Sequence, residues 1–198
     1  MMARLGRDFF ARDTLTVARE LLGQRLVRLL DGERLSGCIV EVEAYVGEED
    51  QACHARSGRT ERNASMYGPP GCAYVYFVYG MHYCLNVVTE REGFPAAVLV
   101  RALEPLTGVE IMRAHRGGRG DVELTSGPAR LCQALAIDRR FDGADLCAPD
   151  VDLFVERDAR VPEGAVAAGP RVGVRGDEAA LAAPWRFCIR DSRYVSRR

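Results

Sequence analysis

The dipeptide Asp31-Gly32 places the strongest single constraint on how this chain can fold. It separates two strand-like runs, residues 25–30 and 35–45, and Asp-Gly between such runs favours the two-residue turn of a β-hairpin. A second hairpin is predicted where Gly80-Met81 separates two runs of aromatic and β-branched residues. Because a hairpin joins antiparallel neighbours, the two together predict an antiparallel sheet.

The remaining pattern mixes helices and short strands without the regular strand–helix–strand rhythm of a parallel sheet. Apolar spacing predicts a helix over residues 14–22 that stops at Gly23. Thr107-Gly108-Val109-Glu110 has the form of a capping box and predicts a helix through His115. Other predicted elements are a helix over 128–136 and strands over 97–103, 171–174 and 186–189. We therefore predict an α+β fold: a single compact domain over residues 1–198 with a mainly antiparallel curved sheet, surrounding helices and a protruding β-hairpin.

Composition limits the class of protein. With 198 residues, 47% of them apolar, the chain can bury one sizeable core. No apolar run approaches the roughly 18 residues needed to cross a membrane. The first residues also lack the apolar segment of a signal peptide. We therefore expect a cytoplasmic protein with no membrane partner.

The cysteines predict reduced thiols. There are seven of them, an odd number, and no two form a Cys-x-x-Cys pair. Several lie in apolar patterns, where a thiol serves as a small hydrophobic group. Zinc would need a tighter cluster of Cys and His, so we predict no metal site.

The charge pattern leaves a local basic face open. A net charge of −1 is low for a nucleic-acid-binding protein, yet all 27 basic residues are arginines. Arg56, Arg59 and Arg62 gather in one polar loop over residues 47–71, and guanidinium groups suit bidentate contacts with phosphate. Charge alone decides nothing about function here.

The run over residues 35–45 is the most informative for chemistry. Alternation places Glu41, Glu43 and Tyr45 on one strand face, with Cys38, Val40, Val42 and Ala44 on the opposite, core-facing side. Two carboxylates on one face are also typical of a solvated strand. The polar loop that follows contains His54, which makes a functional face the more attractive interpretation.

The second informative stretch surrounds the Gly80-Met81 turn. Hairpin tips normally carry polar residues, whereas this one carries Tyr79, Met81 and His82. A bulky tip of this kind could act as a wedge that fills the gap left by a flipped nucleotide. A contact with another protein would explain it almost as well.

Taken together, these residues resemble the alkyladenine (3-methyladenine) DNA glycosylase family, and the resemblance covers nearly the whole chain. The segments that carry it are Glu41-Val42-Glu43-Ala44-Tyr45, Glu49-Asp50, His54, Arg62-Asn63, Pro70-Gly71, Tyr74-Val75-Tyr76, Tyr79-Gly80-Met81, Asn86, Arg101-Ala102-Leu103-Glu104-Pro105, Ser126-Gly127-Pro128 and Leu131-Cys132-Gln133-Ala134-Leu135. The chain departs from the family's mammalian members at His82, where they have a larger aromatic residue, and in a slightly shorter loop over 59–67.

The resemblance implies a role for each matching position. It implies that Glu43 is the general base that activates water and that Arg101 helps to position Glu43 and the water. Base-binding roles fall on Tyr45, His54, Tyr76 and Asn86, and contacts with the DNA at the wedge fall on Tyr79, Met81 and His82.

The implied activity is that of a monofunctional DNA glycosylase of base excision repair in the bacterial cytosol. Its expected partner is double-stranded DNA that contains damaged purines (3-methyladenine, 7-methylguanine, hypoxanthine or ethenoadenine), and we expect a monomer without a cofactor. Stacking on tyrosines would favour a cationic base, whereas neutral lesions would need the help of an acid. The absence of lysine excludes a lysine Schiff-base lyase and predicts an intact abasic site as product.

Two alternatives remain at the level of sequence. Glu41 and Glu43 could stand roughly 6–7 Å apart, within reach of the carboxylate spacing of inverting carbohydrate glycosidases. A non-catalytic nucleic-acid-binding module is the other alternative, and it would tolerate the loss of the Glu43 carboxylate.

Overall fold

The protein, described by a computed structural model for residues 2–78 and 80–196, is built on one antiparallel sheet. The strands are β1 (Arg25–Leu30), β2 (Glu33–Val46), β3 (Ala73–Val78), β4 (His82–Val88), β5 (Ala96–Thr107), β6 (Leu153–Glu156), β7 (Val166–Gly169) and β8 (Arg186–Ile189). Their order is β3-β4-β5-β2-β1-β6, and β8 pairs with both β2 and β7. Every strand pair in the described part of the chain is antiparallel, as predicted.

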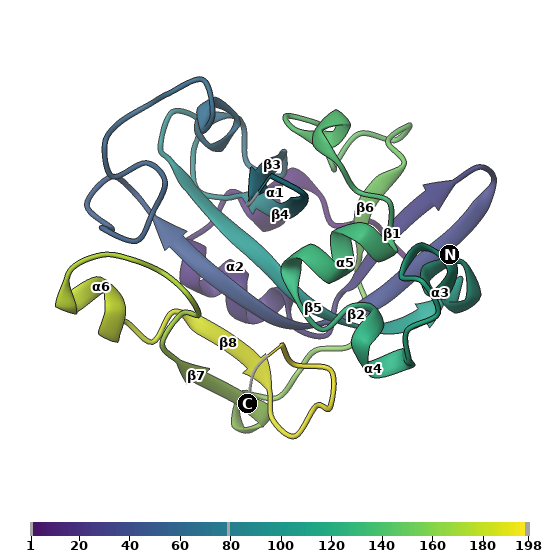
Figure 1. Ribbon diagram of the computed structural model, residues 1–198. Coiled ribbons are helices and arrows are strands. Elements are labelled where there is room, and N and C mark those ends of the chain that lie inside the picture. The colour runs from purple at the N-terminus through teal and green to yellow at the C-terminus, as the bar shows by residue number, and fades with distance from the viewer. Residues whose placement is uncertain (1, 79, 197–198) are drawn as a thin grey trace.

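Short helices surround this sheet and complete the predicted α+β fold. They are α1 (Arg7–Phe10), α2 (Thr14–Leu21), α3 (Val109–His115), α4 (Asp121–Leu124), α5 (Pro128–Ala134) and α6 (Glu178–Ala182), with 3₁₀ turns η1 (Ala64–Tyr67), η2 (Arg139–Phe141) and η3 (Glu163–Ala165). Figure 1 shows α2 behind strands β2 and β5, and α5 in front of them. The main core joins apolar side chains of α2, the sheet and α5, such as Leu21, Val42 and Leu131.

The first hairpin forms as its turn sequence predicts. Asp31 and Gly32 both have positive φ, 51° and 83°, as the two central residues of a type I′ turn require. Leu30 pairs with Glu33 directly behind this turn. The predicted helix that ends before Gly23 is also present as α2, and the Asp13 side chain caps it by accepting from the Thr16 amide.

The predicted helix through His115 is present as α3, but its predicted cap and the predicted strand over 171–174 are wrong because tertiary contacts override local signals. Thr107 does not cap a helix but ends β5, where it pairs with Ser36. The helix α3 starts after Gly108, which has a φ of 73° and at which a Cβ atom would lie 2.9 Å from the Arg34 carbonyl oxygen, so no side chain fits there. Residues 171–174 form no strand; they run irregularly beside the candidate site.

Two β-bulges shift the faces of the central strands. Ile39 lies opposite Leu103 and Glu41 opposite Ala102, so Val40 is an extra residue in β2. Val42 then lies opposite Val100, which makes Arg101 an extra residue in β5 and restores the original register.

The predicted core face is therefore wrong for the first half of β2. Ile39 packs in the main core together with Val42 and Ala44. Cys38 and Val40 pack instead in a small separate cluster with Ala102 and Tyr194.

Two segments that are far apart in the sequence lie at the same end of the sheet. The polar loop over residues 47–71 and α6 both lie at the left of Figure 1, near the end of β2.

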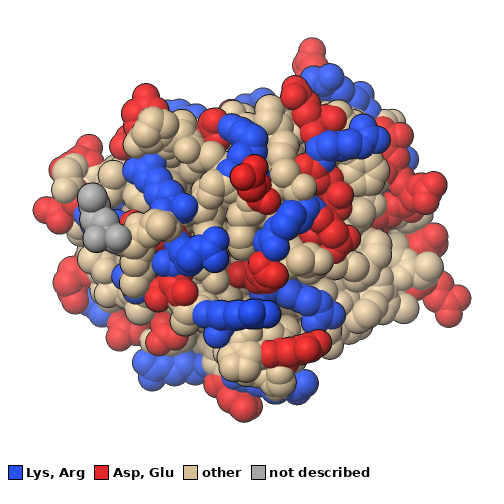
Figure 2. All heavy atoms as spheres, turned by 180° about the vertical axis from the view of Figure 1, so that it is seen from behind, with Lys and Arg blue, Asp and Glu red and all other residues tan. Residues whose placement is uncertain are grey.

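The face that points away from the viewer in Figure 1 is turned toward the viewer in Figure 2. It shows arginines intermingled with acidic residues and no large area of one sign. None of the helices in the described ranges is long and apolar enough to cross a membrane.

Candidate active site

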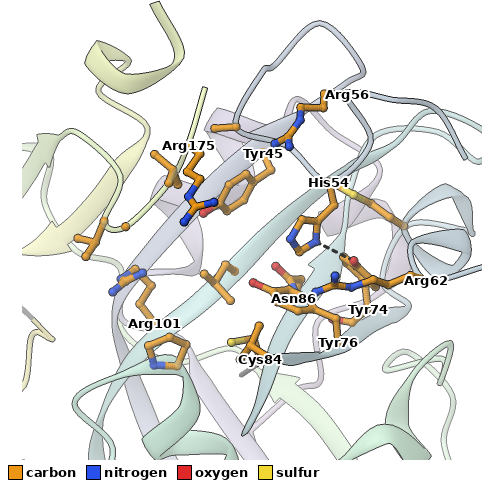
Figure 3. A pocket seen from close by; sticks show the side chains of 18 residues that line it. Tyr45, His54, Arg56, Arg62, Tyr74, Tyr76, Cys84, Asn86, Arg101 and Arg175 are labelled. Carbon is orange, nitrogen blue, oxygen red and sulfur yellow. Dashed lines mark hydrogen bonds between the residues drawn. The ribbon is translucent and has the colours of Figure 1, made fainter. Parts of the chain in front are cut away.

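A cavity of about 640 Å³ opens where the end of β2, the β3–β4 pair, the loop over 47–71 and residues 172–175 meet. Its lining includes Tyr45, His54, Tyr76, Asn86 and Arg101, which Figure 3 shows arranged around it. The fold thus brings together five side chains that the sequence analysis selected from positions far apart in the chain. The volume lies in the range of small-molecule sites.

Glu43 lies directly behind the wall of this cavity. Its side chain is 0% exposed and does not line the cavity. Its Oε1 accepts from the Val172 amide at 2.6 Å, and its Oε2 accepts from the Tyr45 hydroxyl at 2.9 Å and lies 3.1 Å from Arg101 Nη1. All three partners line the cavity, so they fix the orientation of the carboxylate relative to it.

Arg101 is shared between two buried carboxylates. Its Nε lies 3.2 Å from Glu41 Oε1, while its Nη1 contacts Glu43. Burial by itself would lower the pKa of Arg101, but Glu43 and Glu41 outweigh burial and raise it. Arg101 is therefore a cation held in place by both acids.

Glu41 is enclosed by partners rather than turned toward the cavity. Arg186 Nε donates to its Oε1 at 2.6 Å, and Ser196 donates to it from both its amide, at 2.6 Å, and its hydroxyl, at 3.0 Å. Glu41 does not line the cavity. The structure therefore does not present Glu41 and Glu43 as two carboxylates that flank a common cleft, as the carbohydrate-glycosidase alternative would require.

His54 belongs to an aromatic group on the other side of the cavity. Its Nδ1 lies 2.9 Å from the Tyr74 hydroxyl, and its ring meets the Tyr76 ring edge-on at 4.5 Å between centroids. Partial burial of the imidazole in the cavity, together with the positive charges of Arg62 and Arg56, lowers the pKa of His54 to about 4. The imidazole is therefore neutral at physiological pH.

Asn86 is held by the same aromatic strand pair. It lies opposite Tyr74 in the β3–β4 register, and its Nδ2 donates to the Tyr74 carbonyl at 2.9 Å. Because this amide nitrogen is already engaged, the side chain has a fixed position in the cavity wall.

Sequence reasoning missed the buried ion pair that supports the Tyr45 wall. Arg171 contacts Asp50 through two hydrogen bonds of 2.6 and 2.8 Å, and the two side chains are 0% and 1% exposed. The Arg171 guanidinium also lies 4.8 Å from the centroid of the Tyr45 ring. The pair joins Asp50 of the polar loop to Arg171, which directly precedes the cavity-lining Val172. The only signal for it was Asp50 in the matching segments, because residues 171–174 were predicted as a strand.

The hairpin tip adjoins the cavity without lining it. Val78 lines the cavity and pairs with His82 across the turn. Met81 is 69% exposed, and His82 is partly buried. Tyr79 lies outside the described residues. Two of the three predicted wedge residues thus lie at a protruding tip beside the cavity mouth.

The arrangement can hold a planar aromatic ligand next to an oriented carboxylate. Tyrosine rings and a neutral imidazole supply stacking surfaces, while the Glu43–Arg101 pair supplies an acceptor and a fixed charge. In the described ranges no three His, Cys, Asp or Glu side chains gather in a way that could hold a metal ion.

Comparison with known proteins gives one consistent match. The profile of the family "Methylpurine-DNA glycosylase (MPG)" matches residues 8–193. A protein of Methanocella arvoryzae described as "Putative 3-methyladenine DNA glycosylase" is 51% identical over 200 residues, which covers 100% of this chain and 98% of the relative. Relatives with the same description from Desulfitobacterium hafniense (48% identical, 98% of this chain, 99% of the relative) and Anaeromyxobacter dehalogenans strain 2CP-1 (52%, 98% and 86%) match at similar length.

Proposed function

We propose that this chain, which belongs to the methylpurine-DNA glycosylase family, is a monofunctional enzyme that flips a damaged purine out of double-stranded DNA and leaves an abasic site. Membership of the family makes it a DNA glycosylase of DNA repair, a hydrolase that acts on N-glycosyl bonds. The observation that carries the proposal is the carboxylate of Glu43, held by Tyr45, Arg101 and Val172 at the wall of an aromatic cavity.

Hydrolysis also requires that water reach the Glu43 carboxylate, which is 0% exposed behind the cavity wall. Water attacks the anomeric carbon of the flipped nucleotide, Glu43 accepts a proton from that water, and the bond between the anomeric carbon and the purine nitrogen breaks with its electrons going to the base. The negative charge of Glu43 also stabilises the oxocarbenium character of the sugar. Arg101 positions Glu43 because it bridges Glu43 and the enclosed Glu41.

Selection of the base falls to the rings and to Asn86. Tyr45, His54 and Tyr76 would stack on the flipped purine, with His54 within reach of its edge. The fixed amide of Asn86 would clash with the exocyclic amine of a normal guanine. The relatives' description names 3-methyladenine, and we extend the proposed substrates to 7-methylguanine, hypoxanthine and ethenoadenine.

The hairpin tip supplies the wedge in this proposal. Met81 is the most exposed large apolar side chain in the described ranges, and it protrudes next to the cavity mouth with His82 behind it. An apolar group inserted between base pairs offsets the cost of unstacking, a few kcal/mol per step. A single flipped nucleotide needs one pocket, so we expect a monomer to act.

Single-turnover excision tests the proposal. The substrates are a duplex with one central hypoxanthine and methylated duplex DNA, and the proteins are wild type, Glu43→Gln and the control Glu104→Gln, which removes an exposed carboxylate from β5. We expect wild type and control to release free base and to leave a site that breaks only after alkali. Glu43→Gln should be at least about 100-fold slower, the scale of a lost general base.

Other results would contradict the proposal in different ways. Equal release by Glu43→Gln would remove Glu43 as the base while keeping the glycosylase. Strand breakage before alkali would remove the monofunctional assignment. No release by folded wild type from either substrate would leave only a DNA-binding role.

A further inference from the structure

We propose that Arg62 is a specificity-determining residue that favours the excision of uncharged damaged purines over positively charged, alkylated ones; this inference rests on the glycosylase function proposed above.

The cavity lining is rich in cations and poor in anions. Arg56, Arg62, Arg101 and Arg175 line it, whereas no Asp or Glu does among the described residues. Arg101 is balanced by Glu41 and Glu43, but no carboxylate of the described ranges lies within ion-pair distance of the other three. Among the described residues, Arg62 donates a hydrogen bond only to the Phe77 carbonyl, at 3.3 Å. The cavity therefore has an excess of positive charge.

The rings proposed to stack on the base already have cationic neighbours. The Arg62 guanidinium lies 6.0 Å from the centroid of Tyr76, and that of Arg171 lies 4.8 Å from the centroid of Tyr45. Figure 3 shows Arg62 extended toward Tyr74 and Tyr76 on the cavity side. Aromatic rings alone would favour a cationic base, but an arginine this close to the rings repels such a base.

The charge of Arg62 also acts on His54. Burial is the main cause that lowers the pKa of His54, and the positive charges of Arg62 and Arg56 add to it. The charge of Arg62 thus acts on groups inside the cavity and not only at its rim.

Cleavage of the glycosidic bond changes the charge of the purine, and a nearby arginine therefore affects neutral and cationic purines differently. When the glycosidic bond breaks, its electron pair moves onto the purine. A cationic purine thereby becomes neutral and leaves without help, whereas a neutral purine gains negative charge until it is protonated. Relative to free enzyme and DNA, a fixed cation stabilises the transition state of a neutral purine, which carries developing negative charge. It opposes the transition state of a cationic purine, which still carries part of its positive charge, so it raises the ratio of the two kcat/KM values.

The test compares two substrates and a matched pair of variants. Duplexes that differ only in a central hypoxanthine (neutral) or 7-methylguanine (cationic) are processed under single-turnover conditions with sub-saturating enzyme, so that the rates report kcat/KM. Arg62→Gln is compared with Arg59→Gln, which removes an arginine from the same loop. Arg59 lies 5.7 Å from the ring of Tyr67, and neither residue lines the cavity. Arg62 and Arg59 are both exposed, so neither variant should impair folding.

We expect Arg62→Gln to slow hypoxanthine excision about tenfold and to leave 7-methylguanine excision within about twofold of wild type, the scale of one nearby charge. Arg59→Gln should leave the ratio of the two rates unchanged, and Arg62→Lys should restore it. An equal loss on both substrates, a loss on 7-methylguanine alone, or a ratio that lysine does not restore would overturn the inference. Excision of neither base by folded wild type would instead refute the proposed function on which it rests.

Discussion

Arg101 is itself the extra residue of the bulge in β5, and this bulge sets the position of its side chain. In a regular strand its side chain would follow the alternation of its neighbours, but the bulge sets it between Glu41 and Glu43. A guanidinium suits this position because its planar fork can serve two carboxylates at once. A lysine ammonium would be a point charge and could not hold both acids in the same geometry.

At the scale of single residues, the pKa of His54 makes a testable prediction. In the unfolded chain a histidine binds a proton near pH 6.5, whereas folded His54 does so near pH 4. Between these values the unfolded chain binds more protons, so acidification through this interval lowers the free energy of unfolding. His54 is exposed at the cavity mouth, and water there moderates the effect.

The measurement is a titration of the imidazole resonances by NMR, with the His54 signal assigned from its absence in His54→Gln. We expect a midpoint well below 6.5 in wild type and a higher midpoint in Arg62→Gln, because one of the two repelling charges is gone. Arg59→Gln is the control and should leave the midpoint in place. A wild-type midpoint at or above 6.5 would contradict the assigned environment.

The residues of the candidate site differ in what could predict them. The strands that carry Tyr45, Tyr76 and Asn86 are visible in the sequence pattern, whereas the place of these residues at the cavity was implied by the family resemblance. Arg171 could not be, because its partner Asp50 lies 121 positions away and only the folded chain joins them. Its local sequence, with alternating valines, favours a strand that does not form.

At the scale of elements, the loop over residues 47–71 depends on that buried pair. Asp50 accepts from the amides of Val46 and Ala52 as well as from Arg171, so it fixes the start of the loop against β2. Asp50→Asn would leave the Arg171 charge buried without a counterion. We expect a loss of about 3 kcal/mol or more in the free energy of unfolding, the usual consequence of breaking a buried pair from one side.

Chemical denaturation measures this loss, and Asp145→Asn is the matched control. Asp145 pairs with Arg7, but both side chains of that pair are 40% exposed. The same substitution there should cost less than about 1 kcal/mol. Similar losses in the two variants would show that the Asp50–Arg171 pair does not anchor the loop.

The elements themselves were predictable where a turn or cap decides them locally. Asp31-Gly32 forms its hairpin because two positive φ values are needed and these residues tolerate them. The start of α3 and the bulges of β2 and β5 depend on which strand lies alongside. No pattern within β2 reveals that Val40 is an extra residue, so half of its core face was assigned to the wrong side.

At the scale of the whole molecule, the net charge of −1 predicts few contacts with phosphates rather than an extended basic surface. The face in Figure 2 mixes both signs. We expect the logarithm of DNA affinity to fall linearly with the logarithm of salt concentration, with a slope of about −3 for roughly three phosphate contacts.

Fluorescence anisotropy with a labelled duplex measures this slope. Arg175→Gln removes a cavity-rim cation and should make the slope less negative by about 0.9. Arg160→Gln, an exposed arginine that does not line the cavity, should leave the slope unchanged. A wild-type slope near zero, or near −10, would contradict the small number of contacts.

The hydrogen bond between Ser196 and Glu41 joins positions 155 residues apart, so it can form only when nearly the whole given sequence has been synthesised. During synthesis β2 emerges with both acids long before residues 171–196 exist to cover them. Until then the contacts of Val172, Arg186 and Ser196 with these carboxylates are missing. A translation product that ends between residues 175 and 196 would therefore contain every residue that lines the cavity but not the Ser196 contacts with Glu41 and Arg101.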